Sequence, residues 1–188
     1  MTMMSTLALK ANTPAVRAEL ATMGAAYTGY KSDEQLHPEA IDPNLIYIAL
    51  LVATQEHGED FTQLLWQLFL DSHNAHEREN FLSAMAQSSD PKIAQWLRTK
   101  LLSSEIKDNE IFPIMWGQMN RSENRDDMWA WAKDNMPDLL ERVAKQRQGQ
   151  LPSIFDTFCS LEKAADIEQF FDPIIDNLES GPRNLANA

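Results

Sequence analysis

Cysteine, positive charge and long apolar runs are all scarce in this chain of 188 residues. The single cysteine, Cys159, excludes an internal disulfide and a metal cluster held by several cysteines. The longest apolar run covers residues 45–53, far short of the roughly 20 residues that a membrane-spanning helix needs. We therefore expect a buried helix there and no membrane insertion by this segment. The N-terminus has no signal-peptide pattern, and nothing in the sequence specifies a compartment.

Positive charge is too sparse for binding to nucleic acid. Lys and Arg number 16 against 28 Asp and Glu, which gives a formal net charge of -12. Nucleic acids and anionic membranes are bound through clustered cations, so the composition excludes both as main partners. The acids are concentrated late in the chain, in residues 156–179, which we interpret as a solvated helix face.

The sequence is rich in short amphipathic helices, and residues 74–116 show the pattern best. Asn74, Asp90-Pro91 and Asn109 each provide a helix start, because Asp or Asn can cap a first turn and Pro is tolerated there. Apolar residues between these starts fall three and four positions apart, so each helix has one face to bury. None of these helices is long enough to be stable alone.

Similar signals divide the rest of the chain. A helix from Thr13-Pro14 is expected to stop near Gly24 or Gly29, and an apolar helix is expected from Asp42-Pro43 to Gly58. Further helices are expected over residues 61–70, from Ser122 or Asn124 to near Asn135, from Pro137 to about Gly149, from Leu151-Pro152 through Leu161, and around residues 167–171 before Pro173.

No segment alternates with the period of a strand, so we expect an all-α fold of about nine or ten short antiparallel helices. Short capped helices joined by tight polar turns favour an α-α superhelix, a solenoid of HEAT-like pairs, with a globular helical bundle as the alternative. Residues 1–12 are expected to be a frayed segment or an upstream linker. Residues 13–188 are expected to form a single helical repeat domain.

The chain offers no convincing catalytic group. His73, His76 and Glu77 form HxxHE, which is neither HExxH nor HxxEH, and His73 precedes the cap at Asn74. We therefore favour exposed turn histidines over a metal site. Cys159 falls on an apolar helical stripe and is predicted to be a buried, unreactive thiol. Core packing is the expected role of the five tryptophans, residues 66, 96, 116, 129 and 131.

Several segments, taken together and in order, resemble a known family. They are Leu36–Leu45 (LHPEAIDPNL), Arg78 with Phe81–Ala86, Asp90-Pro91, Trp129-Ala130-Trp131 with Asn135, Phe158–Ser160, Phe170-Phe171 and Gly181–Ala186. In this order and spacing the sequence resembles the C-terminal helical domain of alanyl-aminopeptidase-type zinc metallopeptidases, the M1 peptidase family. That family includes the puromycin-sensitive and endoplasmic-reticulum aminopeptidases. The resemblance runs from about residue 13 to the end.

This resemblance implies a HEAT-like or armadillo-like superhelix that packs against a separate catalytic domain and closes its substrate chamber. The zinc-binding HExxH of the family lies in that upstream domain, so zinc is expected there and no cofactor is expected in this chain. We expect the chain to be a fragment of a longer peptidase, and its abrupt end at Asn187-Ala188 fits an artificial cut. Its expected partners are the upstream catalytic domain of the same polypeptide and, through it, peptide substrates.

The expected function is that of a non-catalytic C-terminal domain of a zinc-dependent aminopeptidase, which removes N-terminal residues from peptides. The domain would limit peptide access to the chamber. Gln87, Asn120 and Arg121 are candidates to line it, because they lie at predicted helix ends. In some relatives a basic residue contacts the far end of the peptide where this chain has Gln87. A free-standing helical-repeat adaptor that binds a protein partner is the alternative.

Overall fold

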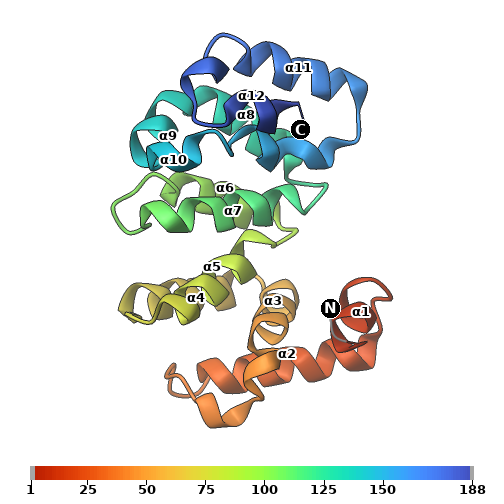
Figure 1. Ribbon diagram of the computed structural model, residues 1–188. Coiled ribbons are helices and arrows are strands. Elements are labelled where there is room, and N and C mark those ends of the chain that lie inside the picture. Colours follow the sequence, from red (N-terminus) through yellow and green to blue (C-terminus); the bar gives the residue numbers. More distant parts are fainter. Residues whose placement is uncertain (1–2, 187–188) are drawn as a thin grey trace. The chain divides into compact units, whose positions relative to one another are not determined.

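The computed structural model describes residues 3–186, and those residues form helices and no strand (Figure 1). This confirms the predicted all-α fold class. The chain divides into two compact units, one reaching to Ala94 and the other beginning at Gln95. The predicted boundary at residue 12 and the single domain beyond it stay predictions, as does the superhelical repeat.

The first unit is built mainly from five α-helices. They are α1 (Met3–Leu9), α2 (Pro14–Thr28), α3 (Ile46–His57), α4 (Glu59–Asp71) and α5 (Ala75–Ala86), with short 3-10 helices at Pro38–Ala40 and Pro43–Leu45. Helix α3 is apolar through its middle turns, and there it packs against α2, α4 and α5 (Figure 1). Its residues from Ile48 to Thr54 are all buried, so the longest apolar run is a core helix, as its length predicted.

Local capping is visible at the start of α5 and at the end of α2. The Asn74 Oδ1 atom accepts hydrogen bonds from the backbone N–H groups of His76 (2.9 Å) and Glu77 (3.4 Å), which confirms the predicted start of α5. Helix α2 ends at Gly29, whose φ of 61° is the left-handed conformation that glycine adopts at low cost. Gly24, the other predicted end, is a buried mid-helix residue.

The second unit contains shorter helices. Helix α6 (Pro91–Lys100) begins before the division and runs into this unit. It is followed by α7 (Ile111–Met119), α8 (Arg125–Asp134), α9 (Met136–Arg142), α10 (Lys145–Gln148), α11 (Leu161–Phe171) and α12 (Gly181–Leu185), with 3-10 helices at Asp108–Glu110, Pro152–Phe158 and Ile175–Asn177. The described residues thus form twelve α-helices rather than nine or ten, and the shortest of them have only four to seven residues.

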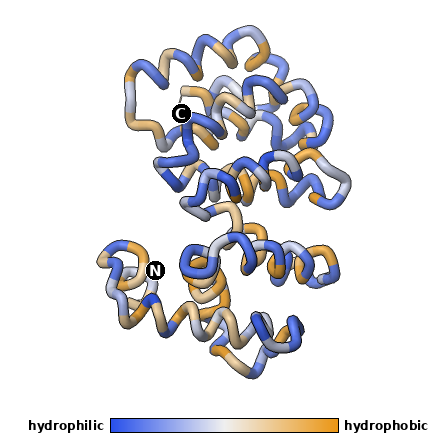
Figure 2. Tube along the Cα trace, turned by 180° about the vertical axis from the view of Figure 1, so that it is seen from behind, coloured by the Kyte–Doolittle hydropathy of each residue, from blue (hydrophilic) through white to orange (hydrophobic). Residues whose placement is uncertain are grey.

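Trp129 is at the centre of the core of the second unit. Its ring is buried, with ring centres 4.6 Å from Phe155, 5.3 Å from Phe170 and 6.2 Å from Phe171. Its indole N–H donates a 2.6 Å hydrogen bond to the Asp166 carboxylate. Figure 2 shows apolar residues recurring along the helices between polar ones. This pattern buries one face of each helix.

Four local predictions are wrong in this unit. The helix expected from Pro137 to about Gly149 is divided at Val143, whose backbone is extended, into α9 and α10. Asn109 lies inside a 3-10 turn and does not cap the next helix, which is preceded instead by a hydrogen bond from the Lys107 N–H to the Glu110 carboxylate (2.8 Å). Cys159 is exposed rather than buried. Leu161, expected on the same buried stripe, is 93% exposed.

The physical reason for the last two errors is the same. Residues 152–158 form a 3-10 helix with about three residues per turn, so the 3.6-residue spacing does not apply. Cys159 then adopts the left-handed conformation (φ 49°), and a new helix starts after Ser160. The apolar stripe is interrupted there, and Leu161 begins α11 on the outside.

The tryptophans are only partly in the core. Trp66 and Trp129 are buried, but Trp96 and Trp131 are half-buried and Trp116 is 40% exposed. Among the described residues, no helix has both the length and the apolar character needed to cross a membrane.

Candidate functional site

Gln87 lies at the C-terminal end of α5, where the sequence placed it. It is half-buried, and its side-chain amide donates a hydrogen bond to the Tyr47 hydroxyl at the start of α3. Partial burial raises the pKa of the Tyr47 phenol above its ordinary value. The pair presents an amide and a phenol at the surface of the first unit.

Asn120 and Arg121 follow α7 in the second unit, again at the predicted helix end. Asn120 is exposed and its backbone N–H bonds to the Trp116 carbonyl (2.9 Å), so its position one turn after Trp116 is fixed. Residues four apart share a helix face. The exposed Trp116 ring and the Asn120 amide therefore lie on one side of this end of α7, and Trp116 is a surface residue that the sequence prediction missed.

Arg121 is partly buried and incompletely paired. One terminal nitrogen is 3.5 Å from the Glu123 carboxylate, which is long for a hydrogen bond, and 29% of the side chain is exposed. Its Nε–H is buried and has no hydrogen-bond partner among the described residues. A buried donor without a partner costs free energy.

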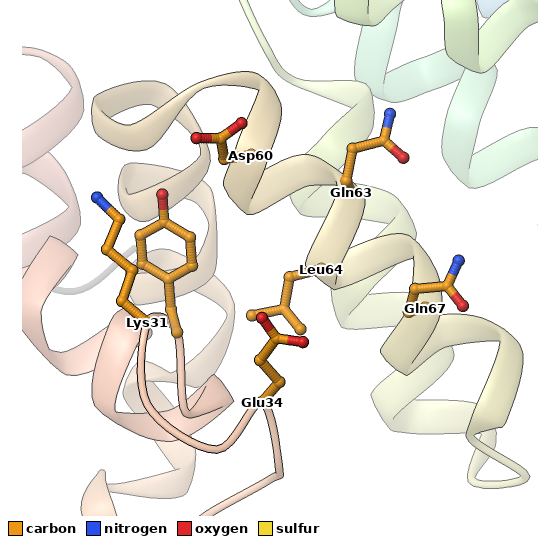
Figure 3. A pocket seen from close by; sticks show the side chains of 7 residues that line it. Lys31, Glu34, Asp60, Gln63, Leu64 and Gln67 are labelled. Carbon is orange, nitrogen blue, oxygen red and sulfur yellow. The ribbon is translucent and has the colours of Figure 1, made fainter.

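The first unit also has a polar pocket of about 500 Å³, which Figure 3 shows from close by. Lys31 and Glu34 come from the loop after α2, and α4 supplies the facing residues Asp60, Gln63, Leu64 and Gln67. The Lys31 ammonium lies 5.0 Å from the centre of the Tyr30 ring. The pocket can donate and accept hydrogen bonds, but it contains neither a nucleophile with its base nor a metal-ligand set.

The histidines do not form a metal site. His73 and His76 are exposed, and His73 precedes the Asn74 cap as the sequence predicted. Over residues 3–186, no three His, Cys, Asp or Glu side chains are arranged so that they could hold a metal ion. The donor groups of this part of the chain thus do not fit a zinc ion.

The structure brings Asn120 and Arg121 together at one helix end and places Gln87 in the other unit. The sequence could locate all three at helix ends because capping signals are local. It gave no sign that Trp116 or Tyr47 would be exposed, since each lies in a segment that is apolar on nearly every side.

Comparison with known proteins gives a consistent result. Residues 2–188 match the family described as the ERAP1-like C-terminal domain. Aminopeptidase 2, mitochondrial, of Saccharomyces cerevisiae is 22% identical over 148 residues, which cover 77% of this chain and 15% of the yeast protein. Aminopeptidase M1-D of Oryza sativa subsp. japonica is 24% identical over 121 residues, covering 63% of this chain and 13% of the rice protein.

The chain thus spans only a small part of the length of these relatives. The family match, by contrast, covers nearly the whole of the chain and agrees with the helical structure and with the resemblance seen in the sequence. This protein chain belongs to the ERAP1-like C-terminal domain family.

Proposed function

We propose that this chain is the non-catalytic C-terminal domain of a zinc-dependent M1 aminopeptidase, and that it closes the substrate chamber and limits peptide access. The family match over residues 2–188 carries the proposal. Two similar proteins are named aminopeptidases and are several times longer than the matched segment. Such lengths leave room for a catalytic domain in the same polypeptide.

The residues present indicate what this chain would contribute to the enzyme and what the upstream domain would contribute. The 188 residues contain no HExxH, and the described side chains offer no ligand set for zinc. Peptide hydrolysis would therefore depend on a metal held upstream. This chain would contribute surface, hydrogen-bonding groups and charge.

Arg121 and Asn120 are the best candidates for contact with peptide in the chamber. The Arg121 side chain is 29% exposed, Asn120 is exposed, and the exposed Trp116 ring lies on the same side of α7 as the Asn120 amide. A peptide backbone provides carbonyl oxygens for these donors. In the first unit, Gln87 would contact peptide together with Tyr47, to which its side-chain amide is hydrogen-bonded.

The whole polypeptide is tested first by its size and its motif. An antibody to this chain should detect a native product several times heavier than 21.4 kDa, and its gene should encode an upstream HExxH. The purified 188-residue chain should not cleave peptides even with added zinc. A native product of 21.4 kDa would overturn the proposal and favour the adaptor.

The chamber role is tested in the full-length enzyme with Arg121→Ala, Asn120→Ala and Gln87→Ala. Each variant should change kcat/KM for long peptides more than for dipeptide substrates, which are too short to reach the chamber wall. Lys145→Ala, at an exposed position of α10, is the control and should leave both unchanged. An unaltered ratio of long- to short-peptide kcat/KM in all three variants would contradict the chamber assignment.

A further inference from the structure

We propose that a groove at the start of α11 is a docking site for a partner protein segment in which large apolar side chains are flanked by Lys or Arg. This inference is independent of the proposed aminopeptidase function. The groove has a volume of about 270 Å³ and runs between the 3-10 helix Pro152–Phe158 and the first turns of α11.

The walls of the groove are mostly apolar. They include Phe155, Phe158, Cys159, Leu161, Ala164 and Ile167. Leu161 is 93% exposed, and Ala164 and Ala165 continue the exposed apolar surface along the next turn of α11. Single exposed leucines are common on protein surfaces, but a leucine contiguous with exposed alanines and a half-buried phenylalanine forms a patch.

The geometry of the corner keeps the groove open. Cys159 adopts the left-handed conformation and so turns the chain sharply between the two helices. The Ser160 hydroxyl then accepts a hydrogen bond from the Lys163 N–H (3.4 Å) and caps α11. On the opposite wall, the Thr157 hydroxyl donates to the Met119 carbonyl (3.3 Å). Both walls are thus tied to backbone groups.

The rim of the groove is acidic. Asp156 lines it, and the exposed Glu162 directly follows Leu161 in the chain. Lys163, in the first turn of α11, is paired: its ammonium lies 2.5 Å from the Asp126 carboxylate and 5.0 Å from the centre of the Phe158 ring. Arg125 is also engaged, because its Nε–H donates to the Met119 carbonyl (2.7 Å) that accepts from Thr157. Opposite charge around an apolar centre is the complementarity that protein interfaces use for orientation and on-rate.

The volume of the groove and the charge of its rim together indicate which kind of segment it would bind. A volume of about 150 Å³ holds a benzene molecule, so this groove can take one or two aliphatic or aromatic side chains. Lys or Arg beside those side chains would meet the acidic rim. A second copy of this chain is a poor occupant, because it brings a net charge of -12 and an equally acidic rim to the contact.

The test uses the full 188-residue chain and a synthetic peptide with blocked ends, in which a Leu-Phe pair lies between two Lys-Arg pairs. Binding is measured by calorimetry. Because Cys159 is the only thiol in the chain and lines the groove, its rate of reaction with a thiol reagent reports occupancy at this place. We expect the peptide to bind and to slow that reaction, and we expect added salt to weaken the binding.

Leu161→Ser should raise the Kd at least about tenfold, because one large apolar contact is lost. Since that side chain is almost fully exposed, the variant should fold normally. Met3→Ser removes an equally conspicuous exposed side chain in the other unit and should leave the Kd unchanged. The double variant Asp156→Asn, Glu162→Gln should weaken binding and reduce its dependence on salt.

Three results would overturn the proposal. The first is no binding of the basic peptide, or binding that leaves the Cys159 reaction unchanged. The second is equal binding of a peptide with Glu-Asp pairs in place of the Lys-Arg pairs. The third combines two observations: light scattering shows that the chain self-associates and that Leu161→Ser abolishes this, while no peptide binding is detected. The occupant of the groove would then be a second copy of the chain.

Discussion

Arg142, at the end of α9, fixes the loop before α7 through one guanidinium group. Its Nη1 atom donates to the carbonyl oxygens of Leu102 (2.8 Å) and Ser103 (3.2 Å), and Nη2 donates to that of Ile106 (2.6 Å). Its Nε atom lies 3.1 Å from the Asp108 carboxylate. The planar fork of arginine supplies all of these donors at once, which a lysine cannot do.

We predict that Arg142→Ala lowers the free energy of unfolding by about 1 to 3 kcal/mol, because hydrogen bonds to a charged donor are lost. Arg142→Lys should recover less than half of that loss. Urea unfolding gives the size of the effect, and hydrogen exchange should show faster exchange confined to residues 101–110. If the lysine variant were as stable as wild type, charge alone would explain the contact and the fork geometry would be unimportant.

Asp166 makes a pH-dependent contribution beside the Trp129 core. The hydrogen bond from the Trp129 indole N–H, followed by the contacts with Lys133, holds the pKa of Asp166 below the usual range of an aspartate. A carboxylate whose pKa is lower in the folded protein than in the unfolded chain stabilises the fold above the unfolded pKa. That stabilisation is lost as the pH falls through the folded pKa.

We therefore predict that Asp166→Asn is less stable than wild type at pH 7, and that the difference shrinks as the pH falls below about 4. Urea unfolding, followed by tryptophan fluorescence at several pH values, measures this difference. Lys133→Met keeps the indole hydrogen bond, the larger cause of the shift, and should remove only a smaller part of the pH dependence. A difference between Asp166→Asn and wild type that stays constant with pH would refute the assignment.

Residues whose structure depends on their immediate neighbours could be predicted from the sequence. Asn74 caps α5 because its side chain needs only the N–H groups two and three residues ahead. Leu161 could not be placed, because its exposure depends on the left-handed turn at Cys159. A left-handed cysteine has no sequence signal comparable to that of a glycine.

At the scale of elements, the contact between α2 and α3 explains why the helix ends at Gly29 and not at Gly24, the other end that the sequence allowed. A side-chain Cβ at this position would lie 2.7 Å from the Ala49 carbonyl oxygen and 2.9 Å from the Ala53 Cβ, both on α3. The glycine thus permits a close helix approach and does not end the helix. Sequence alone cannot separate these two uses of glycine, since the partner helix lies 25 residues away.

This close approach determines whether a substitution at Gly24 raises or lowers the stability of the fold. Alanine is a better helix former than glycine by about 1 kcal/mol, so propensity alone would make Gly24→Ala stabilising. We expect it instead to destabilise by about 1 to 3 kcal/mol, because a backbone atom of α3 must move. Ala18→Gly, at an exposed site of α2, is the control for intrinsic propensity and should cost about 1 kcal/mol. Thermal or urea unfolding measures the stability of both variants. A Gly24→Ala variant more stable than wild type would contradict the packing argument.

For the candidate peptide contacts, too, the sequence predicts local features but not tertiary ones. Helix-end positions such as Gln87, Asn120 and Arg121 follow from local patterns. Their exposure and their hydrogen-bond partners do not, because these depend on tertiary packing. Tyr47 is 40 residues from Gln87 in the chain, yet its hydroxyl accepts the amide hydrogen bond.

At the scale of the whole molecule, the single domain expected over residues 13–188 stays a prediction, and the structure divides into two compact units between Ala94 and Gln95. These descriptions lead to different unfolding behaviour. Each unit has its own buried side chains, among them Leu50 in α3 of the first and Leu139 in α9 of the second. A truncation in one core lowers the stability of everything that unfolds cooperatively with it.

We predict that Leu50→Ala and Leu139→Ala each cost about 2 to 5 kcal/mol, and that each loss is largely confined to its own unit. Hydrogen exchange followed by mass spectrometry should show Leu50→Ala accelerating exchange in α2 to α5 and Leu139→Ala accelerating it in α7 to α11. The two variants are matched in chemistry and burial, so each serves as the control for the other. If either variant accelerated exchange equally in both units, the chain would behave as the single cooperative domain that its sequence suggested.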